Sequence, residues 1–320
     1  MSKIRVLISD GISQVALEKF QSSADFSVNF RKSTSPEELL GLVAECEVLA
    51  IRSASRVTPE VLAAGKNLKL VVRLGAGVDN IDVPAATARG VGVMNTAAAN
   101  SLSAAEHTIA LMFALARKIP QAAASLARGE WKREQFAGFE LTGKTLGVIG
   151  SGQIGRIVME KALALGMRVV AYDPFVSDLS RFPALGAARL LASLEELVSR
   201  SDLVTLHIPR TQETRGVISR ELLSKFKKGS YLLNVARGGL IDDQALWDAL
   251  ESGHLAGAAL DVFEVEPPVF PVKLVEHPRV IATPHLGAST LEAQERVGLV
   301  AFDQVEAFIR KGEKLGFVNP

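Results

Sequence analysis

The sequence predicts an α/β protein built from two doubly wound parallel-sheet domains. Short runs of β-branched and other apolar residues alternate along the chain with segments of helical period, as in parallel sheets whose crossover helices cover both faces. A glycine-rich turn directly follows one such run, at residues 145–149, where a doubly wound sheet places its phosphate-binding loop. At 320 residues the chain is long enough for two domains, each with a core of its own.

A first series of elements occupies the N-terminal third of the chain and predicts a small doubly wound domain. Its expected strands are residues 4–8, 48–51, 69–72 and 91–94. Its expected helices lie near residues 36–45, 59–65 and 84–89.

A long helix is expected to begin at Ser103, because Ser103 to Glu106 has the spacing of a capping box and apolar residues then recur on one helical face. The segment 128–139 that follows is rich in charge but contains Trp131, Phe136 and Phe139, so it is too apolar for a free linker. Two interpretations of this segment remain open: a loop folded back on its own domain, or an arm that contacts a second subunit.

A second, Rossmann-like series of elements begins at Thr145. Its expected strands are residues 145–149, 168–172, 203–207, 231–235, 256–262 and 279–283. Its expected helices are residues 153–165, a short helix opened by Ser193, and residues 243–252. A further capping box, Ser289 to Glu292, predicts a last helix that runs to about Arg310.

The composition excludes several classes of partner. Hydrophobic residues make up 48% of the chain, charged residues 22%, and the net charge is +1, so no field of one sign is available to attract nucleic acid or an anionic membrane. The single cysteine, Cys46, cannot form an internal disulfide and is expected to be buried. With neither a secretory signal nor an apolar run long enough to span a bilayer, we expect a cytoplasmic protein; no metal site is predicted.

The glycine-rich turn predicts a dinucleotide site. In Gly150-Ser151-Gly152-Gln153-Ile154-Gly155, the first glycine makes the tight turn, Gly152 leaves room for a pyrophosphate and Gly155 lets the helix approach the sheet. Asp173 ends the next strand 23 residues after Gly150, where this fold places the carboxylate that binds the ribose hydroxyls. Because a carboxylate repels a 2′-phosphate, the predicted cofactor is NAD rather than NADP.

Three polar residues far apart in the sequence follow predicted strands and can therefore converge: Arg237, Glu266 and His285. An imidazole titrates near neutral pH, so His285 can take the hydroxyl proton of a 2-hydroxy acid and return it. Glu266 can fix the tautomer of that imidazole, and the planar fork of Arg237 can bind the substrate carboxylate. Glu264 is the competing carboxylate, which we interpret as a solvated loop charge.

Two further arginines predict an anion site in the first domain. Arg52 and Arg73 each follow or end a strand, and Gly75-Ala76-Gly77 then exposes backbone N–H groups in a turn that can hold an anion. Together they suggest a substrate that carries a charge beyond its carboxylate, such as a phosphate. The alternative is that these are surface arginines in loops.

These motifs resemble those of the D-isomer-specific 2-hydroxyacid dehydrogenase family along nearly the whole chain. The matching stretches are Val71 to Asn80, Asn100 to Glu106, Asn234 to Gly239 and Pro284 to Thr290. Ala76 and Ser151 depart mildly from the family pattern, in which threonine and a larger apolar residue are frequent.

The resemblance implies a set of functional residues. The implied catalytic residues are Arg237, Glu266 and His285. The implied cofactor contacts are Gly150, Gly152, Gln153, Ile154, Gly155, Asp173, Ile208, Pro209, Val235, Ala236, Asp261, Gly287 and Ala288. The implied substrate contacts are Arg52, Arg73, Gly75, Ala76, Gly77 and Asn100.

It also implies an architecture and an activity. The NAD-binding Rossmann domain (residues 99–286) would be inserted in a flavodoxin-like substrate domain (residues 1–98 and 287–320), without the regulatory extension that longer relatives carry. The helix after Ser103 and the arm around Trp131 would form a homodimer. The expected reaction is oxidation of the small anion 3-phospho-D-glycerate; the alternatives are a reductase of hydroxypyruvate or glyoxylate, and an NAD-sensing corepressor.

Overall fold

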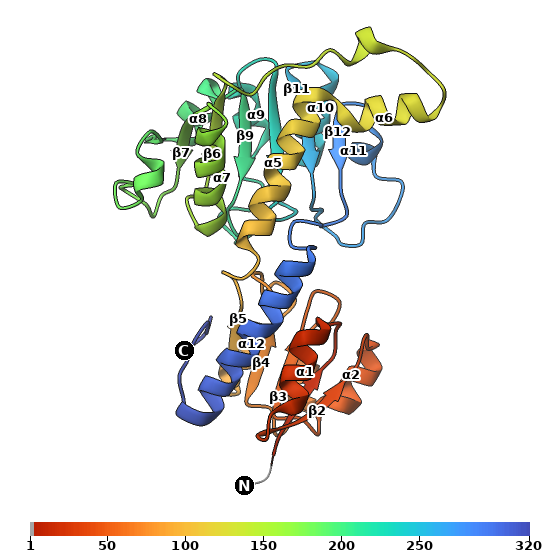
Figure 1. Ribbon diagram of the computed structural model, residues 1–320, viewed down its shortest axis with the longest axis vertical. Helices are drawn as coiled ribbons and strands as arrows, with labels where there is room; N and C mark the ends of the chain where they lie inside the picture. Colours follow the sequence, from red (N-terminus) through yellow and green to blue (C-terminus); the bar gives the residue numbers. More distant parts are fainter. Residues whose placement is uncertain (1–2) are drawn as a thin grey trace. The chain divides into compact units, whose positions relative to one another are not determined.

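The computed structural model describes residues 3–320, which divide into two compact units (Figure 1). Unit 1 contains the residues up to Ser101 together with Ala288–Pro320, and unit 2 is Leu102–Gly287. Each unit has a wholly parallel sheet, so the predicted fold class is confirmed.

Unit 1 contains a five-stranded sheet in the order β2-β1-β3-β4-β5. The strands are β1 (Ile4–Ile8), β2 (Phe26–Phe30), β3 (Val48–Ile51), β4 (Leu70–Arg73) and β5 (Gly92–Asn95). The helices are α1 (Gln14–Ser22), α2 (Pro36–Val43), α3 (Pro59–Ala64), α4 (Val83–Ala88) and α12 (Leu291–Lys311). The strand order is that of flavodoxin-like folds.

Side chains alternate between the two faces of this sheet and form two cores. Val6 and Ile8 of β1 pack with α1 and α12, whereas Leu7 packs with α2, α3 and α4. Cys46 belongs to the second core, and burial raises the pKa of its thiol to about 12. The prediction of a buried cysteine is therefore confirmed.

Unit 2 contains a seven-stranded sheet in the order β12-β11-β10-β9-β6-β7-β8, which is the Rossmann order with one strand added beyond the last. The strands are β6 (Thr145–Ile149), β7 (Arg168–Tyr172), β8 (Arg189–Leu190), β9 (Leu203–Leu206), β10 (Ser230–Asn234), β11 (Leu255–Leu260) and β12 (Val280–Ala282). The helices are α5 (Ser101–Arg117), α6 (Ile119–Ala127), α7 (Gln153–Ala164), α8 (Leu194–Arg200), α9 (Arg220–Lys225), α10 (Asp243–Glu251) and α11 (Lys273–Glu276), with 3₁₀ turns at Arg133–Phe136 and Pro183–Leu185.

The starts of two helices differ from those predicted. α5 begins at Ser101 rather than Ser103, because the Ser101 hydroxyl bonds back to the carbonyl of Ala97 and a turn already leads into the helix. The last helix is capped by Thr290 rather than Ser289, since the Thr290 hydroxyl accepts the N–H of Ala293. Both corrections are small, and the last helix ends at Lys311.

The two ends of segment 128–139 fit different interpretations: the end near Phe139 folds back on its own unit, and the part around Trp131 remains a candidate arm. At its end, Phe139 packs on Tyr231 with ring centroids 5.1 Å apart, and its N–H bonds to the carbonyl of Ala116, so this part folds back on unit 2. Trp131 is 79% exposed, which leaves the arm interpretation open for the rest.

Among the described residues, no single helix combines the length and apolar composition needed to cross a bilayer. The pair formed by α5 and α6, bent by 63°, meets those criteria only when the two helices are taken together.

Candidate active site

The carboxyl ends of six neighbouring strands in unit 2 carry most of the predicted site residues. Because the strands are parallel, these ends lie at one edge of the sheet. The residues that follow them are Gly150 after β6, Asp173 after β7, Ile208 and Pro209 after β9, Val235 and Ala236 after β10, Asp261 after β11 and His285 after β12.

The glycine loop has the shape that a pyrophosphate requires. Gly150 has φ of 99°, and a Cβ there would meet the carbonyl of His207 at 2.5 Å. A Cβ at Gly155 would overlap the carbonyl oxygen of Gly150. By contrast, Gly152 is the N-cap of α7 without a side-chain cap, and a Cβ there would meet no atom within 4 Å. The helix N-terminus therefore opens onto free space, as an anion site needs, and Gln153 and Ile154 form its first turn.

Asp173 lies against this loop. One carboxylate oxygen accepts the N–H of Ser151 at 2.7 Å, and the other accepts the N–H of Phe175 at 2.9 Å. The second bond shows that Asp173 also caps the turn before Pro174, but the first places its carboxylate beside the loop. The Ser151 hydroxyl is buried and finds no hydrogen-bond partner within residues 3–320. The loop therefore combines an open helix N-terminus with a neighbouring carboxylate, the two features that a dinucleotide site of this fold requires.

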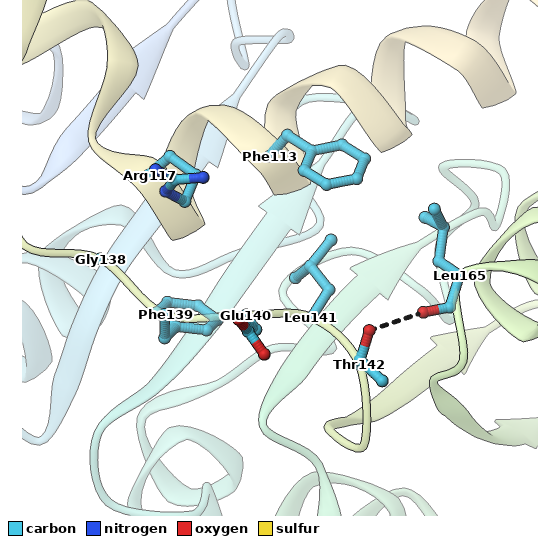
Figure 2. Close-up of a pocket in the computed structure, with 8 residues that line it drawn as sticks. All are labelled: Phe113, Arg117, Gly138, Phe139, Glu140, Leu141, Thr142 and Leu165. Carbon is cyan, nitrogen blue, oxygen red and sulfur yellow. Dashed lines mark hydrogen bonds between the residues drawn. The ribbon is translucent and has the colours of Figure 1, made fainter.

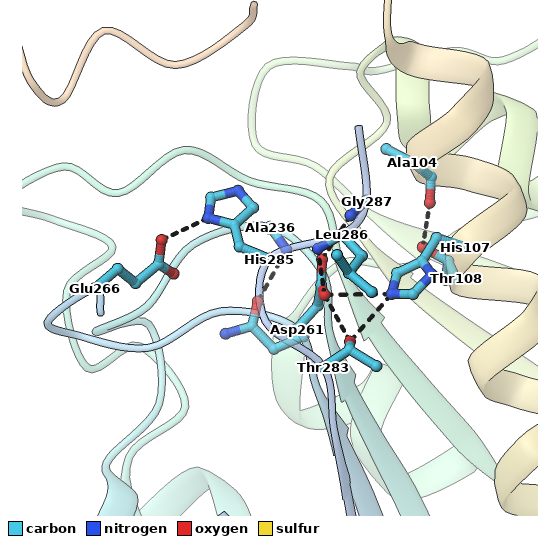
Figure 3. A network of polar contacts seen from close by, with 11 residues as sticks. Ala104, His107, Thr108, Ala236, Asp261, Glu266, Thr283, His285, Leu286 and Gly287 are labelled. Carbon is cyan, nitrogen blue, oxygen red and sulfur yellow. Dashed lines mark hydrogen bonds and ion pairs between the residues drawn. The ribbon is translucent and has the colours of Figure 1, made fainter. Parts of the chain in front are cut away.

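His285 and Glu266 form a pair. The Nδ1 atom of His285 lies 2.5 Å from a carboxylate oxygen of Glu266, as Figure 3 shows. The other carboxylate oxygen of Glu266 accepts the N–H of Phe263 at 2.9 Å. Burial alone would raise the pKa of Glu266, but the bonds from His285 and Phe263 and the charge of Arg237 lower it below its ordinary value. Glu266 is therefore an ionised partner that occupies Nδ1 of His285.

Glu264 lies in a different environment from Glu266. Its carboxylate forms an exposed ion pair with Arg215 at 2.5 Å. This pairing on the surface fits the interpretation of a solvated loop charge.

The turn that carries Arg237 is fixed by Asn234, a residue that the sequence analysis did not assign to the site. The Asn234 side chain accepts the N–H of Ala236 at 3.1 Å and donates to the carbonyl of Arg237 at 2.8 Å. A Cβ at Gly238 would overlap the carbonyl of Phe263, so only glycine lets this turn pack on the loop that leads to Glu266. An asparagine at the end of a buried strand could have indicated this role, because asparagine side chains often hydrogen-bond the backbone of the turn that follows.

The predicted substrate arginines belong to unit 1. The N–H of Arg52 donates to the buried carboxylate of Asp10 at 2.6 Å, and Asp10 also accepts the N–H and hydroxyl of Ser55. Asp10 was not predicted, although it follows the end of β1. Nη1 of Arg73 donates to the carbonyl of Leu74 at 2.5 Å, beside Gly75 at φ 143°.

The rest of the predicted anion-binding turn is also in unit 1. The carbonyl of Ala76, the residue before Gly77, accepts the side-chain amide of Asn95 at 2.7 Å. Asn100 is buried, and its side-chain oxygen has no partner within the part of the chain that the structure describes. An orphaned buried acceptor of this kind is typical of a ligand site.

Asp261 is held within the protein rather than exposed. Both oxygens of its buried carboxylate accept backbone N–H groups, from Leu286 at 2.7 Å and from Gly287 at 2.8 Å. The Val235 side chain and the Asp261 carboxylate both lie against Gly287. Ala288, the next residue, is the first residue of the C-terminal part of unit 1. His107 of α5, which was not among the predicted site residues, joins this network, with Nε2 3.3 Å from Oδ1 of Asp261.

A hollow in unit 2 contains none of the predicted site residues in its lining. It has a volume of about 690 Å³ and lies at the C-terminal end of α5 (Figure 2). Its lining includes Phe113, Arg117, Phe139, Glu140 and Leu165.

Comparison with known proteins identifies the family. Residues 109–287, all within unit 2, match the family model described as the NAD binding domain of D-isomer specific 2-hydroxyacid dehydrogenases. The chain belongs to this family. The match confirms both the resemblance seen in the sequence motifs and NAD as the predicted cofactor.

Individual relatives extend the similarity beyond unit 2. The chain is 46% identical over 315 residues to D-3-phosphoglycerate dehydrogenase of Bacillus subtilis (strain 168), covering 98% of this chain and 59% of the relative. It is 42% identical over 307 residues to a hydroxypyruvate reductase of Thermotoga maritima, covering 95% and 98%. A crystal structure of a protein from Thermus thermophilus superposes with a TM-score of 0.89 at 35% identity, covering 98% and 100%.

The relatives differ in length. The chain spans between 53% and 59% of seven relatives named D-3-phosphoglycerate dehydrogenase, but nearly all of the Thermotoga maritima reductase.

Proposed function

We propose that this protein oxidises 3-phospho-D-glycerate to 3-phosphohydroxypyruvate with NAD, as the first step towards serine. The observation that carries the proposal is the bond between His285 and Glu266, at the same sheet edge as the glycine loop. We assign NAD binding to unit 2 and binding of the substrate phosphate to unit 1. The relatives named D-3-phosphoglycerate dehydrogenase, 44% to 47% identical, support this choice of substrate.

The proposed reaction moves one hydride and one proton. The glycine loop and Asp173 would hold NAD, which would supply the acceptor for the hydride from C2 of the substrate. Nε2 of His285 accepts the hydroxyl proton, so that C2 and its oxygen form a carbonyl. The ionised Glu266 bonded to Nδ1 stabilises the imidazolium that results. Arg237 holds the substrate carboxylate through two parallel hydrogen bonds and fixes the orientation of C2.

The phosphate is the part of the substrate that distinguishes it from related hydroxy acids. Arg52 and Arg73 are the cations of unit 1 that we assign to it, with Gly77 supplying a backbone N–H, since the N–H of Gly75 already donates to the carbonyl of Arg73 at 2.9 Å. Asp10 holds the backbone N–H of Arg52, and Nη1 of the Arg52 guanidinium donates to the carbonyl of Gly11 at 3.4 Å, which leaves its other N–H groups for a ligand.

A hydroxypyruvate reductase is the second candidate. The Thermotoga maritima relative of that name matches this chain over 98% of its own length. Such an activity would run the same hydride and proton transfer in reverse but would need no phosphate site.

Turnover of phosphorylated and unphosphorylated substrates separates the two candidates. We expect NADH formation with 3-phospho-D-glycerate, and we expect Arg52→Ala to raise the KM for this substrate at least about tenfold while changing that for hydroxypyruvate less than about twofold. An equal rise in the KM for both substrates in Arg52→Ala would contradict the assignment of Arg52 to the phosphate. Faster turnover of hydroxypyruvate than of 3-phospho-D-glycerate by the unmodified enzyme would favour the reductase.

We also propose that the protein forms a homodimer through α5, α6 and the arm around Trp131. Large apolar side chains are exposed along this region, including Phe113, Ile119, Leu126 and Trp131. The hollow of Figure 2 lies beside Phe113 and could receive side chains from a second copy. Sedimentation equilibrium should give twice the chain mass, and Leu126→Glu should shift the protein towards monomer. A monomeric unmodified protein would contradict this.

A further inference from the structure

The backbone turn that carries His285 is bound by a single buried aspartate. The carboxylate of Asp261 accepts the N–H groups of Leu286 and Gly287, and its backbone carbonyl accepts the N–H of His285 at 2.8 Å. The Asp261 side chain is fully buried. Every residue of the turn from His285 to Gly287 is therefore hydrogen-bonded to Asp261, and Figure 3 shows the two bonds to its carboxylate, from Leu286 and Gly287.

This turn needs such support because His285 has an unfavourable backbone conformation. Its φ is 54°, in the left-handed region that residues with a side chain seldom adopt. A conformation of this kind persists only where surrounding contacts hold it. The orientation of the His285 imidazole therefore depends on the orientation of the Asp261 carboxylate.

His107 on α5 fixes that carboxylate from the other side. Its Nε2 lies 3.1 Å from the hydroxyl of Thr283 and 3.3 Å from Oδ1 of Asp261. The Thr283 hydroxyl donates to the same Oδ1 at 2.6 Å, so its oxygen is left to accept from Nε2 of His107. Burial would raise the pKa of Asp261, but the bonds from His107, Thr283 and the Leu286 N–H lower it below its ordinary value.

We propose that His107 is a positioning residue for His285, acting through Thr283 and Asp261. Through its N–H it holds the threonine hydroxyl and the aspartate in the one arrangement that supports the turn. His107 does not contact His285, and its partners come from the ends of β11 and β12, so its effect on catalysis is indirect. The inference rests on the proposed function, because it takes His285 as the proton acceptor.

Kinetics of two His107 variants and one control test this role. In His107→Ala we expect kcat to fall about 10- to 100-fold, as displacement of a reacting group by an ångström can cause, while KM and the Kd of NADH change less than about threefold. In His107→Gln, which retains an N–H donor, kcat should return to within about fivefold of wild type. A kcat within twofold of wild type in His107→Ala, or no recovery in His107→Gln, would overturn the proposal.

The matched control is His277→Ala. His277 is also a buried histidine of unit 2 with a carboxylate partner, Glu251 at 3.1 Å, but it belongs to no part of the site. We expect this variant to lose stability without losing kcat. An equal loss of kcat in both alanine variants would mean that general destabilisation, rather than positioning, explains the effect.

A second measurement does not depend on turnover and separates this inference from the proposed function. Hydrogen exchange of the peptide spanning residues 283–288 reports on the bonds from Leu286 and Gly287 to Asp261. Exchange should be at least about tenfold faster in His107→Ala and unchanged in His277→Ala. Unchanged exchange in His107→Ala would overturn the inference even in an active enzyme, whereas absent turnover in wild type would overturn only the proposed function.

Discussion

Nδ1 of His285 and the carboxylate of Glu266 lie 2.5 Å apart, although 19 residues separate them in the chain. The two side chains come from the segments that follow neighbouring strands, β12 and β11. This contact gives the imidazole one fixed tautomer and a negative neighbour, which is what a proton acceptor beside a hydride transfer requires.

Removing the charge of Glu266 should slow the reaction without removing the cofactor. In Glu266→Gln the amide can still contact His285, but it cannot stabilise an imidazolium, so we expect kcat to fall about 10- to 100-fold with little change in the Kd of NADH. Steady-state kinetics and a fluorescence titration of NADH measure the two quantities. The control is Glu264→Gln, which breaks only the exposed pair with Arg215 and should retain full activity.

The same pair predicts a pH dependence. Because the folded state lowers the pKa of Glu266 below 4.5, its carboxylate stays ionised above that pH, and its contribution to stability is lost only as pH falls through the lowered value. Below pH 4.5, the difference in melting temperature between wild type and Glu266→Gln should therefore shrink as pH falls through the lowered value. A difference that has already vanished at pH 4.5 would contradict a lowered pKa.

The guanidinium of Arg237 should not be replaceable by an ammonium. Arg237→Lys keeps the positive charge but cannot form two parallel bonds to a carboxylate, so we expect kcat/KM to fall at least about tenfold. The matched control is Arg215→Lys, an exposed arginine of the same unit that pairs with Glu264. Unchanged KM and kcat in Arg237→Lys would show that this residue does not bind the substrate.

Asp173 should determine the preference for NAD. Replacing its carboxylate in Asp173→Asn removes the repulsion of a 2′-phosphate, while the amide oxygen can still accept the N–H of Ser151. We expect the ratio of kcat/KM for NAD to that for NADP to fall at least about tenfold. An unchanged ratio would place the ribose away from Asp173.

The sequence allowed prediction of the strands and helices whose apolar pattern is continuous, but not of the elements that depend on distant partners. α1 and β2 were not predicted. β2 lies at the edge of its sheet with polar residues such as Ser27 and Asn29 in it, and α1 buries Phe20 against Phe302 of α12, at the other end of the chain. The local sequence pattern around Phe20 does not reveal a partner so distant in the chain. Tertiary packing therefore determines these two elements.

The candidate site could be predicted to a different extent for different residues. His285, Asp173 and the glycine loop could be assigned to the candidate site from the sequence because each follows a buried strand, and parallel strands end at one edge of the sheet. Asn234, Asp10 and His107 were not assigned, since each acts through backbone groups or side chains that only the folded chain brings near. Their local sequence is that of any polar residue at the end of a strand or on a helix.

The most direct test of the account is turnover of 3-phospho-D-glycerate with NAD by the wild-type protein and by His285→Ala, followed by the NADH absorbance band. We expect wild type to form NADH and the variant to lose a factor of about 100 or more in kcat, with the Kd of NADH unchanged. Near-normal turnover by the variant would contradict the assignment of His285 as the proton acceptor.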